Sequence, residues 1–184
     1  MRRDPGTVLE ELLVASAMSG SEEAFGQLIA RWTPRLIRHA SHLLHDSDAA
    51  RDAVQEAWVG AARGLRRLED PARFPPWIFS LVSRRCVDSV RRAVRDRRFM
   101  SQASEVADKT ARDAADEQLD LRDAVARLPV AQRLIVSLHY GEGFSVDEIA
   151  AAHGLPPGTV KSRLSAARET LRRYLEGDDY DDHR

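Results

Sequence analysis

At residues 144–175 the chain reads FSVDEIAAAHGLPPGTVKSRLSAARETLRRYL, and this stretch predicts two helices joined by a tight turn. Ser145 and Glu148 have the spacing of a capping box, in which the serine hydroxyl caps the helix and the glutamate reaches back. Gly154 can adopt the left-handed conformation that ends a helix. A longer helix with a stripe of leucine and alanine starts near Thr159. The pattern indicates a helix-turn-helix.

The second of these helices is polar and basic. Residues 159–173 hold five basic residues against one acid, Glu169, which gives a net charge of +4. A helix of this kind fits the major groove of DNA, where residues of its first turns reach base edges. The alternative is an αα-hairpin that binds nothing. The coincidence of capping box, turn glycine and basic helix favours DNA binding.

Helical periodicity extends over most of the 184 residues, which leave room for one ordinary domain or two small ones. Apolar residues recur at three-to-four spacing over 25–44, and Pro34 is expected to kink this helix or to begin a new one. A second helix is expected at about 48–65. Residues 68–76 contain three prolines and predict a non-helical loop, after which a third helix is expected over about 77–97.

The helical pattern is lost at residues 99–117, which are small, polar and acidic, and it returns near residue 121. After a break at Pro129, a helix is expected over 130–140. We therefore predict an all-α fold of two small helical domains, a bundle of three to four helices and a helix-turn-helix, joined by a flexible linker. The predicted segments are an N-terminal extension (1–19), a first module (20–98), an acidic linker (99–117), a second module (118–176) and an acidic tail (177–184).

Charge is distributed unevenly along the chain, although the formal net charge is only -1. Residues 63–98 hold eleven arginines against four acids, net +7, whereas residues 99–120 have a net charge of −4. Two basic blocks separated by an acidic one indicate two surfaces that face a polyanion. Solvated helix faces are the alternative.

The composition excludes several classes of protein. Charged residues make up 31% and hydrophobic residues 43% of the chain, which is typical of a folded, soluble protein. The single Cys86 excludes an internal disulfide, and the N-terminus lacks a signal-peptide core. We therefore expect a cytoplasmic protein that does not insert into a membrane.

Residues that could carry catalysis or hold a metal are sparse. His39, His42 and His45 lie three apart, but no acid pair or cysteine completes a site with them, so we expect a solvated face and no metal site. The sequence has no glycine-rich phosphate loop and no Ser-His-Asp grouping. Neither enzymatic activity nor a cofactor is expected.

Motifs in both modules resemble one protein family. In the second module they are Leu128-Pro129, the run from Phe144 to Ala150, the run Gly158-Thr159-Val160-Lys161-Ser162-Arg163-Leu164, and Ala167-Arg168. In the first module they are Glu23-Ala24-Phe25, residues 48–58 (DAARDAVQEAW), the run from Phe74 to Phe79, and the run from Arg84 to Arg92. These motifs are similar to region 4 and region 2 of bacterial RNA polymerase sigma factors of the ECF (extracytoplasmic function) type.

The resemblance implies an alternative sigma factor that binds core RNA polymerase and directs initiation at specific promoters under the control of an anti-sigma factor. It implies polymerase contacts at Asp48, Asp52, Gln55, Glu56 and Trp58. Contacts with the minus-ten element and its melted single strand are implied at Arg67, Arg73, Phe74, Trp77, Phe79, Arg84, Arg85, Asp88, Arg91 and Arg92. Contacts with the double-stranded minus-thirty-five element are implied at Thr159, Lys161, Ser162, Arg163, Ser165 and Arg168.

Two other functions stay open beside this one. An ordinary helix-turn-helix repressor or activator would act as a dimer without polymerase, but it would not need the first module. A sigma mimic that only sequesters an anti-sigma factor would not need a basic recognition helix. Arg84 departs from the family pattern, in which asparagine is common at that position.

Overall fold

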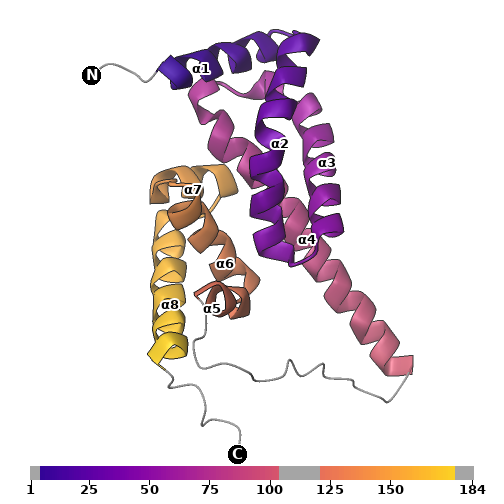
Figure 1. Cartoon of the computed structure of the whole chain (residues 1–184), viewed down its shortest axis with the longest axis vertical. Coiled ribbons are helices and arrows are strands. Elements are labelled where there is room, and N and C mark those ends of the chain that lie inside the picture. The colour runs from indigo at the N-terminus through magenta and orange to yellow at the C-terminus, as the bar shows by residue number, and fades with distance from the viewer. Residues whose placement is uncertain (1–4, 104–120, 177–184) are drawn as a thin grey trace, which may run out of the picture.

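The structure, a computed structural model, describes residues 5–103 and 121–176, and the regular elements in these ranges are all helical (Figure 1). The predicted all-α class is therefore confirmed. The first module contains α1 (Pro5–Met18), α2 (Glu22–Leu44), α3 (Ser47–Gly64) and α4 (Phe74–Ala103). The second contains α5 (Leu121–Arg127), α6 (Val130–Val136), α7 (Val146–His153) and α8 (Pro157–Glu176). Residues 99–103 continue α4 where a linker was expected, and the rest of the predicted linker lies outside the described residues.

Helix α1 occupies the predicted N-terminal extension and packs on α2. Val14 and Ala17 are buried against the bundle, whereas Leu12 is 60% exposed. The helix also contacts the two short 3-10 turns η1 (Leu65–Arg67) and η2 (Pro71–Arg73) that connect α3 to α4. The N-terminal segment is thus part of the first module and supports its connecting loop.

Helix α2 runs without a break through Pro34, so of the two alternatives predicted there, a kink or a new helix, the new helix is wrong. The hydroxyl of Ser21 caps the helix by accepting a backbone N–H three residues on, at 3.2 Å. Proline removes one backbone donor from a helix interior. Burial of Leu28, Trp32 and Leu36 on the inner face keeps the helix continuous on both sides of this gap.

The connection between α3 and α4 spans residues 65–73, so it begins and ends three residues before the predicted loop, and it contains the turns η1 and η2 where a non-helical loop was expected. The carboxylate of Asp70 accepts the backbone N–H of Ala72 at 2.9 Å and begins η2. Helix α4 then starts at Phe74, so Pro75 and Pro76 lie in its first turn. Backbone N–H groups in a first turn have no partner within the helix, and prolines there remove no hydrogen bond.

The helix-turn-helix of the second module has the predicted caps. Ser145 Oγ accepts the backbone N–H of Glu148 at 3.2 Å, and the Glu148 carboxylate accepts the backbone N–H of Ser145 at 2.8 Å. Gly154 ends α7 in the left-handed region with φ of 64°. The helix expected over 130–140 consists of two parts in the structure. Helix α6 ends at Val136, and a π-helical turn, η3 (Ser137–Gly141), follows it directly.

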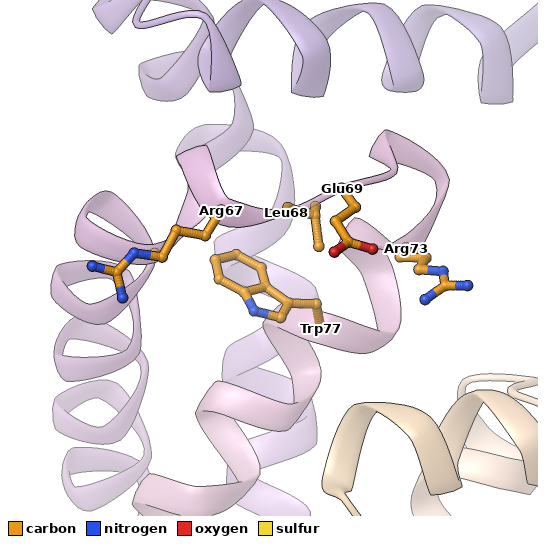
Figure 2. Close-up of a pocket in the computed structure, with 6 residues that line it drawn as sticks. Arg67, Leu68, Glu69, Arg73 and Trp77 are labelled. Carbon is orange, nitrogen blue, oxygen red and sulfur yellow. The ribbon is translucent and has the colours of Figure 1, made fainter.

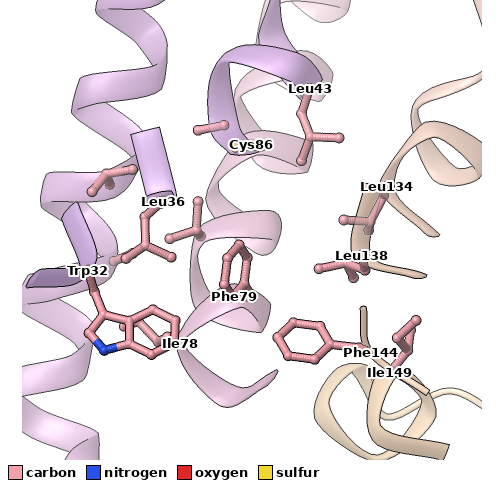
Figure 3. Packing of buried hydrophobic residues seen from close by; sticks show 14 of the residues in the cluster. Trp32, Leu36, Leu43, Ile78, Phe79, Cys86, Leu134, Leu138, Phe144 and Ile149 are labelled. Carbon is pink, nitrogen blue, oxygen red and sulfur yellow. The ribbon is translucent and has the colours of Figure 1, made fainter. Parts of the chain in front are cut away.

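The two modules pack against each other, with α4 touching α7 and α2 touching α6. Phe79 of α4 meets Phe144 edge to face, with ring centroids 5.4 Å apart. Figure 3 shows this pair between Leu36 on one side and Leu138 and Ile149 on the other. The buried hydrophobic residues of both modules therefore form a single cluster.

Candidate functional site

The outer face of α3 is polar and mainly acidic. Asp52, Gln55 and Glu56 are exposed there, whereas Val54 points into the core, as their spacing predicts. Val59, one turn beyond Gln55, is 55% exposed and adds an apolar side chain to the same face of α3. A strip of this kind complements a protein surface that presents arginine.

Two residues of the predicted polymerase-binding set are engaged inside the first module. Asp48 accepts a hydrogen bond from Arg51 at 2.8 Å in an exposed pair on α3. Trp58 is 7% exposed, donates its indole N–H to Thr33 Oγ1 at 3.0 Å, and meets Phe25 edge to face at 5.8 Å. Trp58 therefore holds α3 against α2, and its indole is not available at the surface.

A pocket of about 350 Å³ opens where α3 ends, the η1–η2 loop passes and α4 begins. Figure 2 shows the indole of Trp77 in the middle of it, with the side chains of Arg67 and Arg73 on opposite sides. The other lining residues are Gly64, Leu68 and Glu69. A Cβ at Gly64 would lie 3.1 Å from the Trp77 ring, so glycine gives the ring its space. Trp77 is partly buried. A partly exposed aromatic ring between two guanidinium groups can stack an unpaired base and hold its phosphates.

The other two aromatic residues predicted to contact DNA lie in the core. Phe74 and Phe79 are both 0% exposed, and each meets the ring of Trp32, at 5.5 and 6.2 Å. Phe79 is further covered by Phe144 of the second module. Of the three predicted aromatic residues, Trp77 alone presents its ring to the outside in this structure.

The exposed side of α4 is basic. Asp88 pairs with Arg91 at 3.8 Å, and Arg85 pairs with Glu56 of α3 at 3.6 Å. The predicted residues on this side are all exposed: Arg84, Arg85, Asp88, Arg91 and Arg92. Exposed ion pairs of this kind are weak and exchange readily for phosphate contacts.

Helix α8 presents the polar face that its sequence predicts. Val160, Leu164 and Ala167 are buried, so α8 packs on α6 and α7 through its apolar stripe. Four of the predicted DNA contacts are exposed, namely Lys161, Ser162, Ser165 and Arg168. The other two, Thr159 and Arg163, are half-buried. The exposed set begins in the first turns of the helix, which reach base edges in helix-turn-helix proteins.

The two modules match two family models, Sigma-70 region 2 over residues 28–96 and Sigma-70, region 4 over residues 118–171. The chain is 34% identical over 164 residues to the ECF RNA polymerase sigma factor SigM of Mycobacterium tuberculosis, an alignment that covers 89% of this chain and 83% of SigM. The chain belongs to the ECF family of RNA polymerase sigma factors. It is also 30% identical to the RNA polymerase sigma factor CarQ of Myxococcus xanthus, with 85% of this chain and 91% of CarQ covered.

Solved structures of similar proteins agree with this sigma factor fold. CnrH in complex with the cytosolic domain of CnrY is similar with a TM-score of 0.65 and 28% identity, covering 92% of this chain and 99% of that chain. The sigma factor RpoE in complex with the anti-sigma factor NepR from Bartonella quintana has a TM-score of 0.64 and 27% identity, covering 84% and 98%. Within the described ranges of this sigma factor, no helix is long and apolar enough to cross a membrane.

A buried polar cluster that the sequence did not predict lies between the modules of the sigma factor. His39 of α2 is 0% exposed, with Nε2 3.1 Å from Ser83 Oγ and Nδ1 3.0 Å from Ser137 Oγ. Burial, together with the smaller effects of the charges of His153 and His42, lowers the pKa of His39 to about 3. The imidazole is therefore neutral at pH 7, and the solvated position expected for His39 is wrong.

The three histidines of α2 point in different directions. His42 is exposed, and His45, in the left-handed conformation at the end of α2, contacts the guanidinium of Arg133. Within the described residues, no group of three histidine, cysteine, aspartate or glutamate side chains is placed to hold a metal ion.

An ion pair crosses the same contact between the modules. Arg35 of α2 donates from Nε to the carboxylate of Glu142 at 2.5 Å, and the Glu142 side chain is only 10% exposed. The guanidinium also lies over the rings of Trp32 and Phe79, at 5.2 and 5.5 Å from their centroids. Close by, Arg84 of α4 donates to the backbone carbonyl of Ala152 in α7 at 3.3 Å. One predicted minus-ten residue is thus engaged by the second module.

Proposed function

We propose that this sigma factor binds core RNA polymerase through α3, reads the minus-thirty-five element with α8, and captures and melts the minus-ten element with the Trp77 pocket and α4. The pocket carries the proposal. A stacking ring between two arginines, beside a row of exposed arginines, suits a single strand, and a dimeric repressor has no use for it. The basic helix-turn-helix supports the double-stranded contact, and it argues against a sigma mimic that binds no DNA.

Base capture in the pocket has an energetic rationale. Extruding a base from a duplex costs a few kcal/mol. Stacking on one aromatic ring returns roughly 1–3 kcal/mol, which offsets most of that cost at Trp77. Arg67 and Arg73 add phosphate contacts on either side, and Arg84, Arg85, Arg91 and Arg92 of α4 extend the same surface. We assign Asp88 to orienting Arg91, with which it pairs at 3.8 Å.

On the second module, we assign Lys161, Ser162, Ser165 and Arg168 to base edges and phosphates of the minus-thirty-five element. Thr159 and Arg163 are half-buried, and we assign them to the edge of that surface. On the first module, we assign Asp52, Gln55 and Glu56 to the polymerase, with Asp48 at the end of the same helix. Trp58 supports this surface from inside by fixing α3 on α2.

The two DNA-reading surfaces cannot both be used while the modules touch. Elements at minus ten and minus thirty-five are roughly 25 base pairs apart, which is about 85 Å of duplex at 3.4 Å per base pair. The contact through Phe79, Phe144, Arg35 and Glu142 must therefore open when the sigma factor occupies a promoter. We propose that the contacting arrangement is the resting state of the free chain.

An anti-sigma factor is the regulator we propose for this resting state. The likeness to RpoE, solved with the anti-sigma factor NepR, supports it. We also propose that the protein works in the cytoplasm, beside polymerase and promoters, and that it acts through binding and not as an enzyme.

Transcription with core polymerase tests the proposed function. Adding the chain to core enzyme and a library of upstream regions, including that of its own gene, should yield transcripts that depend on the chain. Trp77→Ala should lose most of this transcription, because it removes the stacking ring. Tyr140→Ala removes a 59% exposed aromatic residue outside the pocket and should not. Absence of any chain-dependent transcript would refute the proposal.

A further inference from the structure

The pocket beside Trp77 contains a feature that base stacking does not use. Glu69 contributes the one carboxylate among the six lining residues. Figure 2 shows this carboxylate turned toward the Trp77 side chain. The pocket is otherwise lined by arginine, leucine, glycine and tryptophan, so Glu69 is its single hydrogen-bond acceptor side chain.

The neighbouring side chains leave Glu69 available. Asp70, the next residue, caps η2 by accepting the Ala72 N–H at 2.9 Å and attracts Arg73 to 3.9 Å. Within the described ranges, Glu69 is exposed and has no hydrogen bond or ion pair. A free carboxylate in a site for a polyanion repels phosphates, and this repulsion is offset only when the bound group donates a hydrogen bond to it.

Base edges differ in what they offer to a carboxylate. Cytosine and adenine present an exocyclic amino group, and guanine presents an amino group beside a ring N–H. Thymine has one ring N–H between two carbonyl oxygens, which repel a carboxylate that approaches it. A pocket lined by Glu69 should therefore accept adenine, cytosine or guanine better than thymine.

We propose that Glu69 makes the Trp77 pocket selective for an amino-bearing base and against thymine at one position of the minus-ten strand. This inference rests on the proposed base capture and adds the identity of the base. A good edge contact contributes about 1–3 kcal/mol of discrimination. That range corresponds to thymine being disfavoured by roughly 5- to 150-fold.

The test uses the holoenzyme formed by the full chain and core polymerase. The probe is a fork-junction DNA with six randomised nucleotides on its single-stranded arm, selected by binding and then sequenced. Wild-type holoenzyme should deplete thymine at one position. Glu69→Gln should abolish that depletion, because an amide both donates and accepts, while the other positions stay unchanged. Asp96→Asn, which removes an equal charge from an exposed site on α4, should keep the wild-type pattern.

The possible results separate this inference from the proposed function. If Glu69→Gln tightens binding of all sequences equally and thymine stays depleted, Glu69 only repels phosphates and the inference is wrong. If wild-type holoenzyme accepts thymine at every position, it is also wrong. In either case, if the Trp77→Ala holoenzyme no longer selects particular sequences, the proposed base capture at Trp77 still stands. If Trp77→Ala selects the same sequences as wild type, the proposed capture itself fails.

Discussion

Replacing Glu142 by glutamine should shift the free sigma factor toward separated modules. In the structure, Glu142 accepts the Nε–H of Arg35 at 2.5 Å, and its side chain is 10% exposed. Glutamine has nearly the same shape and keeps a carbonyl oxygen for this bond. The substitution therefore removes the charge of the pair and leaves the packing around Phe144 unchanged.

The magnitude follows from the kind of bond. A hydrogen bond to a charged group contributes about 1.5–3 kcal/mol, against about 1 kcal/mol for a neutral one. Arg35 is 40% exposed, so water screens part of the difference. We expect a loss of about 0.5–1.5 kcal/mol, which raises the ratio of separated to closed molecules roughly 2- to 13-fold.

Single-molecule energy transfer measures that ratio. Ala62→Cys on α3 and Arg173→Cys on α8 give exposed labelling sites in different modules. Cys86 is buried and its pKa is raised to about 12 by burial, so it does not compete for the dyes. Glu169→Gln is the control, because it removes the same charge from an exposed pair with Arg172 inside α8. Equal distance distributions for Glu142→Gln and wild type would show that the ion pair does not hold the modules together.

Three further outcomes can be measured. Arg168→Ala should weaken binding of a cognate minus-thirty-five duplex by roughly 1–3 kcal/mol if it contacts a base edge, and unchanged affinity in a titration refutes that role. Glu56→Lys should reduce core polymerase binding in a pull-down while the helical circular dichroism stays the same; full binding would argue against the α3 surface. Acidification should open the modules, because His39 has a pKa of about 3 in the closed chain and about 6.5 when solvated, so the open state binds more protons. The free energy that favours the closed arrangement begins to fall as the pH drops below about 6.5, and its slope approaches 1.4 kcal/mol per pH unit. If energy transfer depends on pH as strongly in His39→Gln as in wild type, His39 is not the cause of the opening.

The features predicted well from the sequence are those fixed by neighbours in the chain. Ser145 and Glu148 form a capping box through contacts three residues apart, and Gly154 ends α7 through its own backbone. Alternation along α3 likewise separates exposed Gln55 from buried Val54. Each of these depends on local geometry that any helix would impose.

The features that the sequence did not predict depend on contacts between distant segments. Phe74, Trp77 and Phe79 share one short aromatic stretch, yet two of the three rings are buried by Trp32 of α2. Periodicity identifies the faces of a helix but not which face a distant helix will cover. For His39, the covering residue Ser137 lies 98 positions away, beyond any pattern in α2.

The polar character of the contact between the modules suits a contact that, as we propose, opens when the sigma factor occupies a promoter. A wholly apolar interface would expose a large hydrophobic patch once the modules separated, and such patches promote aggregation. Here the phenyl pair is accompanied by the Arg35–Glu142 ion pair, the His39 hydrogen bonds and the Arg84 contact to Ala152. These polar groups are hydrated again when the modules separate. Opening therefore costs less free energy than separating an apolar contact of the same area would. The same step frees Arg84, which we assign to the minus-ten strand, from its contact with Ala152. A single separation would therefore release Arg84 and let the two proposed DNA-reading surfaces reach their elements at the same time.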